Sequence, residues 1–330
     1  MKKLFLLVSF VFISVIFIFI IINKINDNED TELTKIRVAE VTHSIFYAPW
    51  YVALENGYFE DEGLNIEVVL TPGADKVAAA VLSNDVQIGF CGPESTIYVY
   101  NGGENDYLQS FAGLTKRDGQ FIVAREKIDN FSLDDLKGKE ILVGRQGGMP
   151  ALNFLNALYN TNVSEDGIKI NYSIDFASLS GAFIGGTGDY VNLFEPNAIK
   201  LEKEGLGYIV GSVGMLSGEV PYTAFNARKS YIEENYEVIK KFNNALNRGI
   251  KFVMNNSDED VAKVILPQFP DSSLNDIALI VKRYRESDSW LNNTYISSQS
   301  FNNLQDMMIR ADQIKEYVPF NDLINNKYSE

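Results

Sequence analysis

Apolar and polar positions early in the chain alternate between the strand period and the helix period. Ile66, Val68 and Leu70 are separated by single residues, which predicts a strand that stops at Thr71-Pro72-Gly73 before a helix. A preceding helix is expected to open at Ala48-Pro49, with proline in its first turn, and to end at Gly57. The local order is therefore helix, strand, helix.

The next apolar run, Val86 to Phe90, predicts a further strand, and Gly92-Pro93 after it opens another helix. Repeated strand-helix units of this kind build a parallel sheet, and the helix N-termini, with their free N–H groups, gather at one edge of it. Such an edge is a ligand crevice.

Similar patterns recur further along. Phe111 to Leu114 and Phe121 to Ala124 read as strands around a polar turn, and Ile141 to Val143 reads as a strand before a helix that opens at Gly147-Gly148-Met149-Pro150. Apolar residues at helical spacing predict a helix from Tyr231 to Met254.

The first 35 residues have a different character. Two lysines precede an apolar run from Leu4 to Ile22, about 28 Å long as a helix, which is enough to cross a bilayer. No small-residue cleavage site follows, so residues 1–22 are expected to be an uncleaved membrane anchor with the rest of the chain outside the cell. Residues 23–35 are polar and are expected to form a tether.

Composition excludes some functions. A net charge of −15 argues against nucleic acid as a partner. Cys91 is the single cysteine, so no disulfide forms within the chain, and a buried role is favoured for it. His43 is the single histidine and makes no metal site unaided; a hydrogen-bonded loop role is favoured over a ligand contact. We expect no cofactor, no metal and no catalytic residues.

Three sequence blocks carry a family resemblance. The first is APWYVALENGYFEDEGLNIEVV followed by DVQIGFCGPES, the second is GRQGGMPALNFLNALY, and the third is AFIGGTGDYVNLFEPNAIKLEKEG. They resemble the substrate-binding proteins of ABC importers, within the group that serves sulfonates, nitrate, taurine and pyrimidine precursors of thiamine. The resemblance covers roughly residues 36 to 320.

This resemblance implies an α/β fold of two lobes, with mixed sheets flanked by helices and a ligand cleft between the lobes, as in periplasmic binding proteins of type 2. It assigns residues 36–118 and 222–330 to lobe 1 and residues 119–221 to lobe 2. The expected partners are a small-molecule solute, an ABC permease with its ATPase, and the membrane through the N-terminal helix.

Loop residues at the strand ends are the candidates for contacting a solute, because the closing cleft brings the loops of both lobes together. Arg145 has a competing interpretation as an interlobe or surface ion pair, and Met149 as a packing residue. The candidate residues are Ser44, Tyr47, Thr71, Gly73, Glu94, Ser95, Thr115, Arg145, Gly148, Met149, Glu195 and Tyr222.

Glu94 is the most informative of these candidates, and two interpretations stay open for it. In one, it is a first-turn acid that complements the helix dipole. In the other, it faces the cleft and accepts hydrogen bonds from an amidine-like or cationic group. The ligand would then be the partner that a buried carboxylate requires.

The carboxylates and tyrosines near the predicted loops favour a planar, nitrogen-rich solute such as a thiamine-related pyrimidine, because a carboxylate accepts from N–H donors and an aromatic ring stacks on a flat ligand. A sulfonate- or nitrate-type anion is the alternative, because Arg145 could serve it. Two other classes are weighed: an enzyme of the same fold, from thiamine-pyrimidine or menaquinone synthesis, and a sensory or adhesion module. Enzyme chemistry would require a nucleophile and base that the chain does not show.

Overall fold

The computed structural model describes residues 33–329. The expected anchor, residues 1–22, lies outside the described residues, and so does most of the expected tether, residues 23–35. Its last three residues, 33–35, are described, and Thr34 and Lys35 already belong to the first strand. The strand thus begins two residues before the expected end of the tether, and the tether itself stays a prediction. Among residues 33–329, no helix combines the length and the apolar character needed to span a bilayer.

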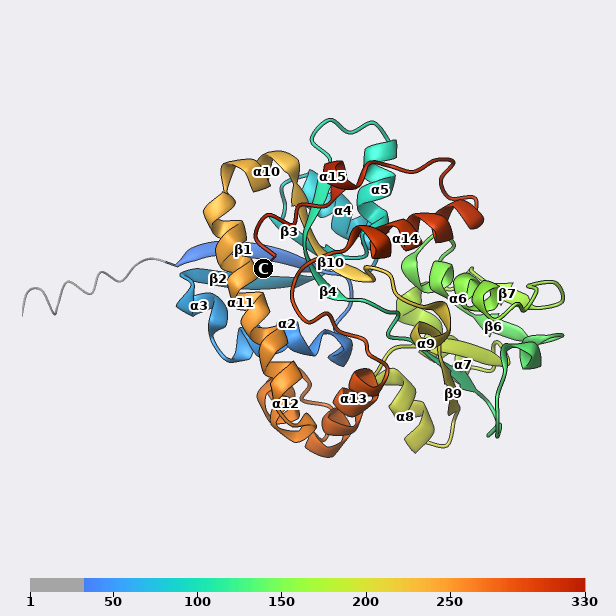
Figure 1. The fold of residues 1–330 in the computed structure, drawn as a ribbon. Coiled ribbons are helices and arrows are strands. Elements are labelled where there is room, and N and C mark those ends of the chain that lie inside the picture. The colour runs from blue at the N-terminus through green and yellow to red at the C-terminus, as the bar shows by residue number, and fades with distance from the viewer. Residues whose placement is uncertain (1–32, 330) are drawn as a thin grey trace, which may run out of the picture. The chain divides into compact units, whose positions relative to one another are not determined.

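Residues Lys35–Glu330 group into one compact unit that contains two five-stranded sheets (Figure 1). The first sheet has the order β2-β1-β3-β10-β4, and the second has the order β7-β6-β8-β5-β9. We call the sheets with their helices lobe A and lobe B. The predicted two-lobe α/β fold with mixed sheets is confirmed.

Lobe A takes its strands from the start of the unit and from one later segment. β1 and β3 are parallel, whereas β10 runs antiparallel to both β3 and β4. Its elements up to the first crossing are β1 (Thr34–Glu40), η1 (Ile45–Tyr47), α2 (Ala48–Glu55), α3 (Tyr58–Asp61), β2 (Leu64–Leu70), α4 (Ala74–Leu82), β3 (Ile88–Cys91), α5 (Glu94–Asn101) and β4 (Leu108–Thr115).

Lobe B lies between the two crossings. β6 is parallel to β7 and β8, and β5 is antiparallel to β8 and β9. Its elements are β5 (Phe121–Ala124), η2 (Leu133–Leu136), β6 (Glu140–Leu142), α6 (Met149–Asn160), β7 (Lys169–Asn171), η3 (Phe176–Ser178), α7 (Leu179–Ile184), β8 (Tyr190–Leu193), α8 (Asn197–Lys203), β9 (Tyr208–Ser212) and α9 (Val213–Ser217).

After lobe B the chain returns through β10 and continues as helices. These elements are β10 (Thr223–Arg228), α10 (Lys229–Glu234), α11 (Tyr236–Asn255), α12 (Asp258–Ile265), η4 (Leu266–Gln268), α13 (Leu274–Glu286), α14 (Ser298–Arg310) and α15 (Phe320–Leu323). The crossings fall at 115–121 and 217–223. The predicted boundaries at 118/119 and 221/222 lie within these segments and stay a prediction.

Local sequence explains several element ends. Pro49 occupies the first turn of α2, and Gly57 adopts φ 69° after the helix, a conformation that favours glycine. Ser132 and Asp135 form the capping box of η2. The helix expected from Tyr231 to Met254 is instead two helices, because Asn235 leaves the helical region with φ −119° and ψ 39° between α10 and α11.

An aromatic core fixes lobe A between its sheet and α11. The rings of Phe90 and Phe225 stack at a centroid distance of 4.1 Å across the neighbouring strands β3 and β10. Trp50 of α2 packs on Phe225, and Phe242 of α11 packs on both of them. Aromatic pairs contribute about 0.5–1.5 kcal/mol each beyond area burial. This core holds α2, and with it the loop that precedes it, in a fixed position.

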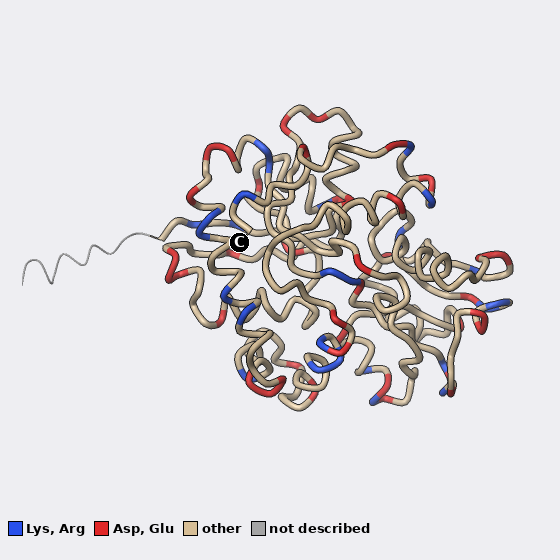
Figure 2. Tube along the Cα trace, viewed as in Figure 1, with Lys and Arg blue, Asp and Glu red and all other residues tan. Residues whose placement is uncertain are grey.

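Charged residues lie mainly on the outer loops and helices (Figure 2).

β2 is the edge strand of lobe A, and its residue Leu70 is 56% exposed. Because β2 spans Leu64–Leu70, the strand expected over 66–70 is confirmed. Its C-terminal residue, Leu70, does not contribute to the core.

One prediction follows from the close approach of α11 to α2. A Cβ at Gly249 would overlap the carbonyl oxygen of Pro49 and lie 2.9 Å from the Cβ of Ala53. Gly249→Ala should therefore lower the free energy of unfolding by about 1–3 kcal/mol, through overpacking, in a denaturant titration of the purified chain.

Gly181→Ala in α7 is the matched control, because nothing lies within 4 Å of its Cβ position. It should stabilise the chain by about 0.5–1 kcal/mol, since alanine is the better helix former. Equal effects of the two substitutions would contradict this packing analysis.

Candidate functional site

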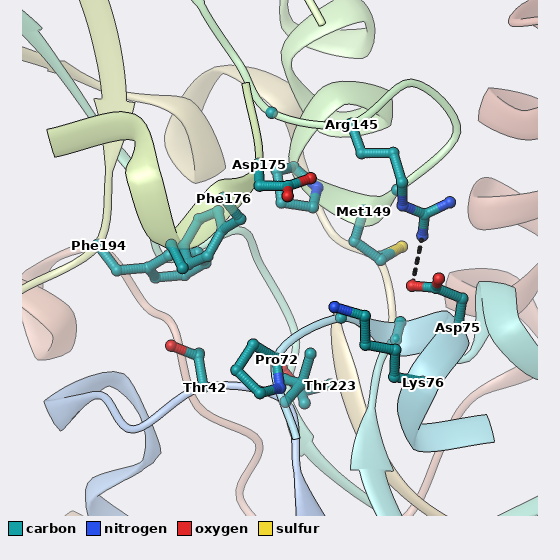
Figure 3. A pocket seen from close by; sticks show the side chains of 18 of the residues that line it. Thr42, Pro72, Asp75, Lys76, Arg145, Met149, Asp175, Phe176, Phe194 and Thr223 are labelled. Carbon is teal, nitrogen blue, oxygen red and sulfur yellow. Dashed lines mark ion pairs between the residues drawn. The ribbon is translucent and has the colours of Figure 1, made fainter. Parts of the chain in front are cut away.

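A cavity of about 460 Å³ lies between the loops of lobe A and lobe B (Figure 3). This volume is within the range of roughly 300–1,000 Å³ that is common for small-molecule sites. Lobe A contributes Val41, Thr42, His43, Tyr47, Leu70, Pro72, Gly73, Ala74, Asp75, Lys76, Gly92, Glu94, Tyr222 and Thr223. Lobe B contributes Gly144, Arg145, Gly148, Met149, Pro150, Asp175, Phe176, Ala177, Phe194 and Asn197.

Among the helix N-termini that border this cavity are that of α4 in lobe A and that of α6 in lobe B. Gly73 precedes α4 and Gly148 precedes α6, and neither helix start has a side-chain cap. Their first N–H groups are donors that a ligand can satisfy, and the helix dipole favours a negative group there. Lys76 and Arg145 line the cavity close to these helix starts, which adds positive charge to the same side.

Arg145 also links the lobes. Its Nη2 atom lies 3.7 Å from Oδ1 of Asp75, and both side chains are about half exposed (Figure 3). Exposed pairs of this kind contribute about 0–1 kcal/mol. A second link between the lobes is a hydrogen bond of ordinary length: the Tyr98 hydroxyl donates to the Gly147 carbonyl oxygen at 2.8 Å. Both contacts join the start of α6 to lobe A.

Glu94 is a buried carboxylate in the cavity wall. It is 2% exposed, and its Oε2 atom has no hydrogen-bond donor among the described residues. Burial raises the pKa of Glu94 to about 7, while backbone N–H groups, including that of Met149 in lobe B, and the Arg145 charge oppose the shift. A Cβ at Gly92 would overlap this carboxylate, so only glycine leaves room for it.

Aromatic side chains form another part of the wall. Phe176 and Phe194 of lobe B meet edge to face, with ring centroids 5.4 Å apart. The ring centroids of Phe194 and Tyr222 are 6.1 Å apart, and Tyr222 directly precedes β10. Tyr47 packs on Phe90 at 4.4 Å, and burial raises its pKa. A flat apolar ligand would therefore meet ring surfaces from both lobes.

His43 borders the cavity but its ring nitrogens are already engaged. Nδ1 lies 3.2 Å from Oε2 of Glu40, and Nε2 lies 2.9 Å from the Gln268 carbonyl oxygen. Burial lowers the pKa of His43, but hydrogen bonds to Glu40 and Gln268 outweigh it and leave the pKa raised. The hydrogen-bonded loop role expected for this histidine is confirmed.

The structure brings seven of the predicted site residues to the cavity. Whether they contact a solute stays a prediction. They are Tyr47, Gly73, Glu94, Arg145, Gly148, Met149 and Tyr222.

Five predicted residues do not line the cavity, and Glu195 is the clearest of them. Its side chain is fully buried, and Oε1 accepts from Arg283 at 2.7 Å, so an internal cation satisfies it instead of a ligand. Ser44 caps η1 and donates to the Glu195 carbonyl oxygen at 2.7 Å. Both residues join the lobes beside the cavity.

The other three are engaged by their own neighbours. Thr71 donates to the Val69 carbonyl oxygen, and Ser95 donates to the Gly92 carbonyl oxygen. Thr115 donates to Thr223 at 2.9 Å, and it is Thr223 that reaches the cavity. Cys91 is buried beside Ser95, as expected, and burial raises its pKa to about 12.

Several lining residues escaped the sequence analysis. Asp75 and Lys76 directly follow Gly73, and Phe194 directly precedes Glu195, so each is a near neighbour of a predicted residue. Asp175 and Phe176 follow β7. The rule that residues after strand ends gather at one edge could have found this pair, but a three-residue strand leaves little apolar pattern.

Comparison with known proteins gives the family. The family model described as NMT1/THI5 like matches residues 45–260. "Putative binding protein YtlA" of Bacillus subtilis (strain 168) is 40% identical over 304 residues, which are 92% of this chain and 91% of that protein.

Two more distant relatives are also named as binding proteins. The riboflavin-binding protein RibY of Chloroflexus aurantiacus is 23% identical over 74% of this chain and 69% of its own length. The formylaminopyrimidine-binding protein of Halalkalibacterium halodurans is 21% identical over 72% of this chain and 71% of its own length.

A solved structure shares the fold. The alkanesulfonate-binding protein SsuA from Xanthomonas axonopodis pv. citri, bound to MOPS, aligns with a TM-score of 0.70 and 16% identity, over 89% of this chain and 98% of that one. The resemblance to substrate-binding proteins of ABC importers is confirmed, and the chain belongs to the NMT1/THI5-like family of two-lobe substrate-binding proteins.

Proposed function

We propose that this protein is the extracytoplasmic component of an ABC importer and captures a planar, nitrogen-rich solute, with a thiamine-related pyrimidine as the first candidate. The observation that carries the proposal is the buried Glu94 carboxylate, whose Oε2 atom has no donor among the described residues and which lines a cavity with aromatic walls. An aminopyrimidine supplies what this site requires: N–H donors at one edge and a flat face.

The chemistry of the pair is favourable in a closed cavity. A hydrogen bond to an ionised carboxylate is roughly twice as strong as a neutral one. A buried polar group without a partner costs about 1–3 kcal/mol, and a charged one costs more. A ligand that donates to Glu94 removes this cost. The relatives named for formylaminopyrimidine and riboflavin support a planar nitrogen heterocycle as the solute class.

An anion is the second candidate solute, and a separate observation favours it. The uncapped starts of α4 and α6, together with Lys76 and Arg145, form a cationic side of the cavity. Sulfonate and nitrate ligands prefer such donors. The neighbour named as an alkanesulfonate-binding protein has the same fold, but at 16% identity it does not decide the ligand.

The cellular setting belongs to the same proposal. Residues 1–22 would anchor the chain in the membrane, and the lobes, assigned as 36–118 with 222–330 and as 119–221, would face the outside and deliver solute to a permease and its ATPase. A binding role is favoured over an enzyme of this fold, because the relatives above are named as binding proteins.

Calorimetric titration tests the solute and the role of Glu94 together. The chain should bind 4-amino-5-hydroxymethyl-2-methylpyrimidine more tightly than taurine, an alkanesulfonate or nitrate. Glu94→Gln should weaken the pyrimidine by at least tenfold, since an amide accepts less strongly and cannot be ionised.

Asp175→Asn is the matched control, because it makes the same chemical change at an exposed carboxylate that also lines the cavity. It should alter the affinity by less than threefold. Tight sulfonate binding without pyrimidine binding would replace the first candidate by the second, and unchanged affinity in Glu94→Gln would remove Glu94 from the site.

The pH dependence of binding follows from the raised pKa of Glu94. Below a pH of about 7 this carboxyl is largely protonated, and its proton must leave before the ionised form accepts from the solute. Affinity should therefore rise from pH 5.5 to about pH 7 and level off above it. Glu94→Gln should flatten this profile. A profile with the same slope in the variant would assign the titration to another group.

The same group makes the solute-free protein sensitive to pH in the opposite sense. The pKa of Glu94 is higher in the folded state, at about 7, than its ordinary value of 4.5, so the folded state holds more protons between these values. Stability should fall as pH rises through this window.

Glu94→Gln removes that loss. It should stabilise the solute-free chain by up to about 3 kcal/mol at pH 8 and by much less at pH 4.5, measured by chemical denaturation at both values. A destabilised variant at pH 8 would show that the carboxylate is satisfied within the protein.

A further inference from the structure

The segment Phe194–Asn197 forms part of the cavity wall in lobe B, yet its backbone and side chains are held by lobe A. Phe194 and Asn197 line the cavity, and Glu195 lies between them. The N–H of Glu195 donates to the Tyr284 hydroxyl at 3.0 Å, and its carbonyl oxygen accepts from Ser44 at 2.7 Å. Tyr284 and Ser44 both belong to lobe A.

The Glu195 carboxylate is satisfied as fully as its backbone. Oε1 accepts from Nη1 of Arg283 at 2.7 Å, and Oε2 accepts from the N–H of Ile199 at 2.7 Å. The side chain of Glu195 has no exposed area, and that of Arg283 is 22% exposed. The second arm of the Arg283 guanidinium donates to Glu202 of α8 at 2.8 Å. Arg283 therefore holds two carboxylates of lobe B at once.

The helix that carries Arg283 is anchored in lobe A. α13 packs on α12 and on η1, and it lies beside α8 of lobe B (Figure 1). The contact between α13 and α8 contains a second ion pair, Lys203 with Asp276, in which the lysine is more than half exposed. The Arg283–Glu202 and Lys203–Asp276 pairs thus join α13 to α8, and the buried Arg283–Glu195 pair joins α13 to the segment just before α8.

We propose that Arg283, which lies outside the cavity, is a positioning residue for solute capture: by pairing with Glu195 across the lobes, it holds Phe194 and Asn197 in the cavity wall. This role rests on the proposed function only in treating the cavity as the solute site. Three of the four bonds to Glu195 come from lobe A, so separation of the lobes at α13 and α8 removes them and releases the segment. We call the Glu195–Arg283 pair the clamp; it forms at the same time as the closed cavity wall.

Hydrogen exchange of the solute-free full chain tests the clamp without a ligand. Peptides that cover residues 193–199 should be protected in the wild type. Arg283→Gln should raise their exchange rate at least tenfold, while peptides from α11 remain unchanged. Arg283→Lys should give a smaller increase, because a lysine keeps the charge but reaches one carboxylate at a time.

Lys203→Gln is the matched control, since it removes the exposed pair between the same helices. It should change exchange at 193–199 by less than twofold. Fast exchange of these peptides in the wild type, or equal exchange in the wild type and Arg283→Gln, would overturn the clamp.

Affinity gives the second measurement. Arg283→Gln should weaken binding of 4-amino-5-hydroxymethyl-2-methylpyrimidine, or of the alkanesulfonate if only that binds the wild type, by at least tenfold, and Lys203→Gln by less than twofold. An unchanged affinity with altered exchange would overturn the positioning role. Failure of the pyrimidine alone would contradict the proposed solute and leave the exchange result to decide the clamp.

Discussion

Burial of a carboxylate between two lobes is the constraint on which the site depends. Glu94 stands at the start of α5 in lobe A, and the N–H of Met149 at the start of α6 in lobe B is among the groups that stabilise its charge. The charged form loses its water when the lobes meet, and the donors inside do not fully replace that water. The empty closed site is therefore costly, and a donating solute lowers that cost.

The two lobes meet through contacts of very different quality. Near α6, the Asp75–Arg145 pair is exposed and weak, whereas on the α13 side the Glu195–Arg283 pair is buried and its carboxylate is fully hydrogen-bonded. A ligand must favour the closed form by about 10⁴-fold to reverse a 99:1 preference for the open form. Contacts between the lobes that form on closure reduce how much of this the solute itself must supply.

Sequence patterns predicted the fold better than the site. Proline at helix starts, glycine at helix ends and the alternation over 66–70 all mark local backbone preferences, so α2, α4, α6 and their strands could be predicted. The role of Glu195 could not, because it depends on Arg283, 88 residues away in the chain, and no local pattern links the two. The same holds for Phe194, whose place in the wall depends on how the lobes meet.

The origin of the cavity wall has an evolutionary consequence. The lining residues come from loops, strand ends and the ends of helices between positions 41 and 223, and none comes from α10 to α15. Substitutions in these loops can change the preferred solute while the aromatic core around Trp50 and Phe242 remains intact. Related chains can then diverge in what they bind without a loss of folding stability.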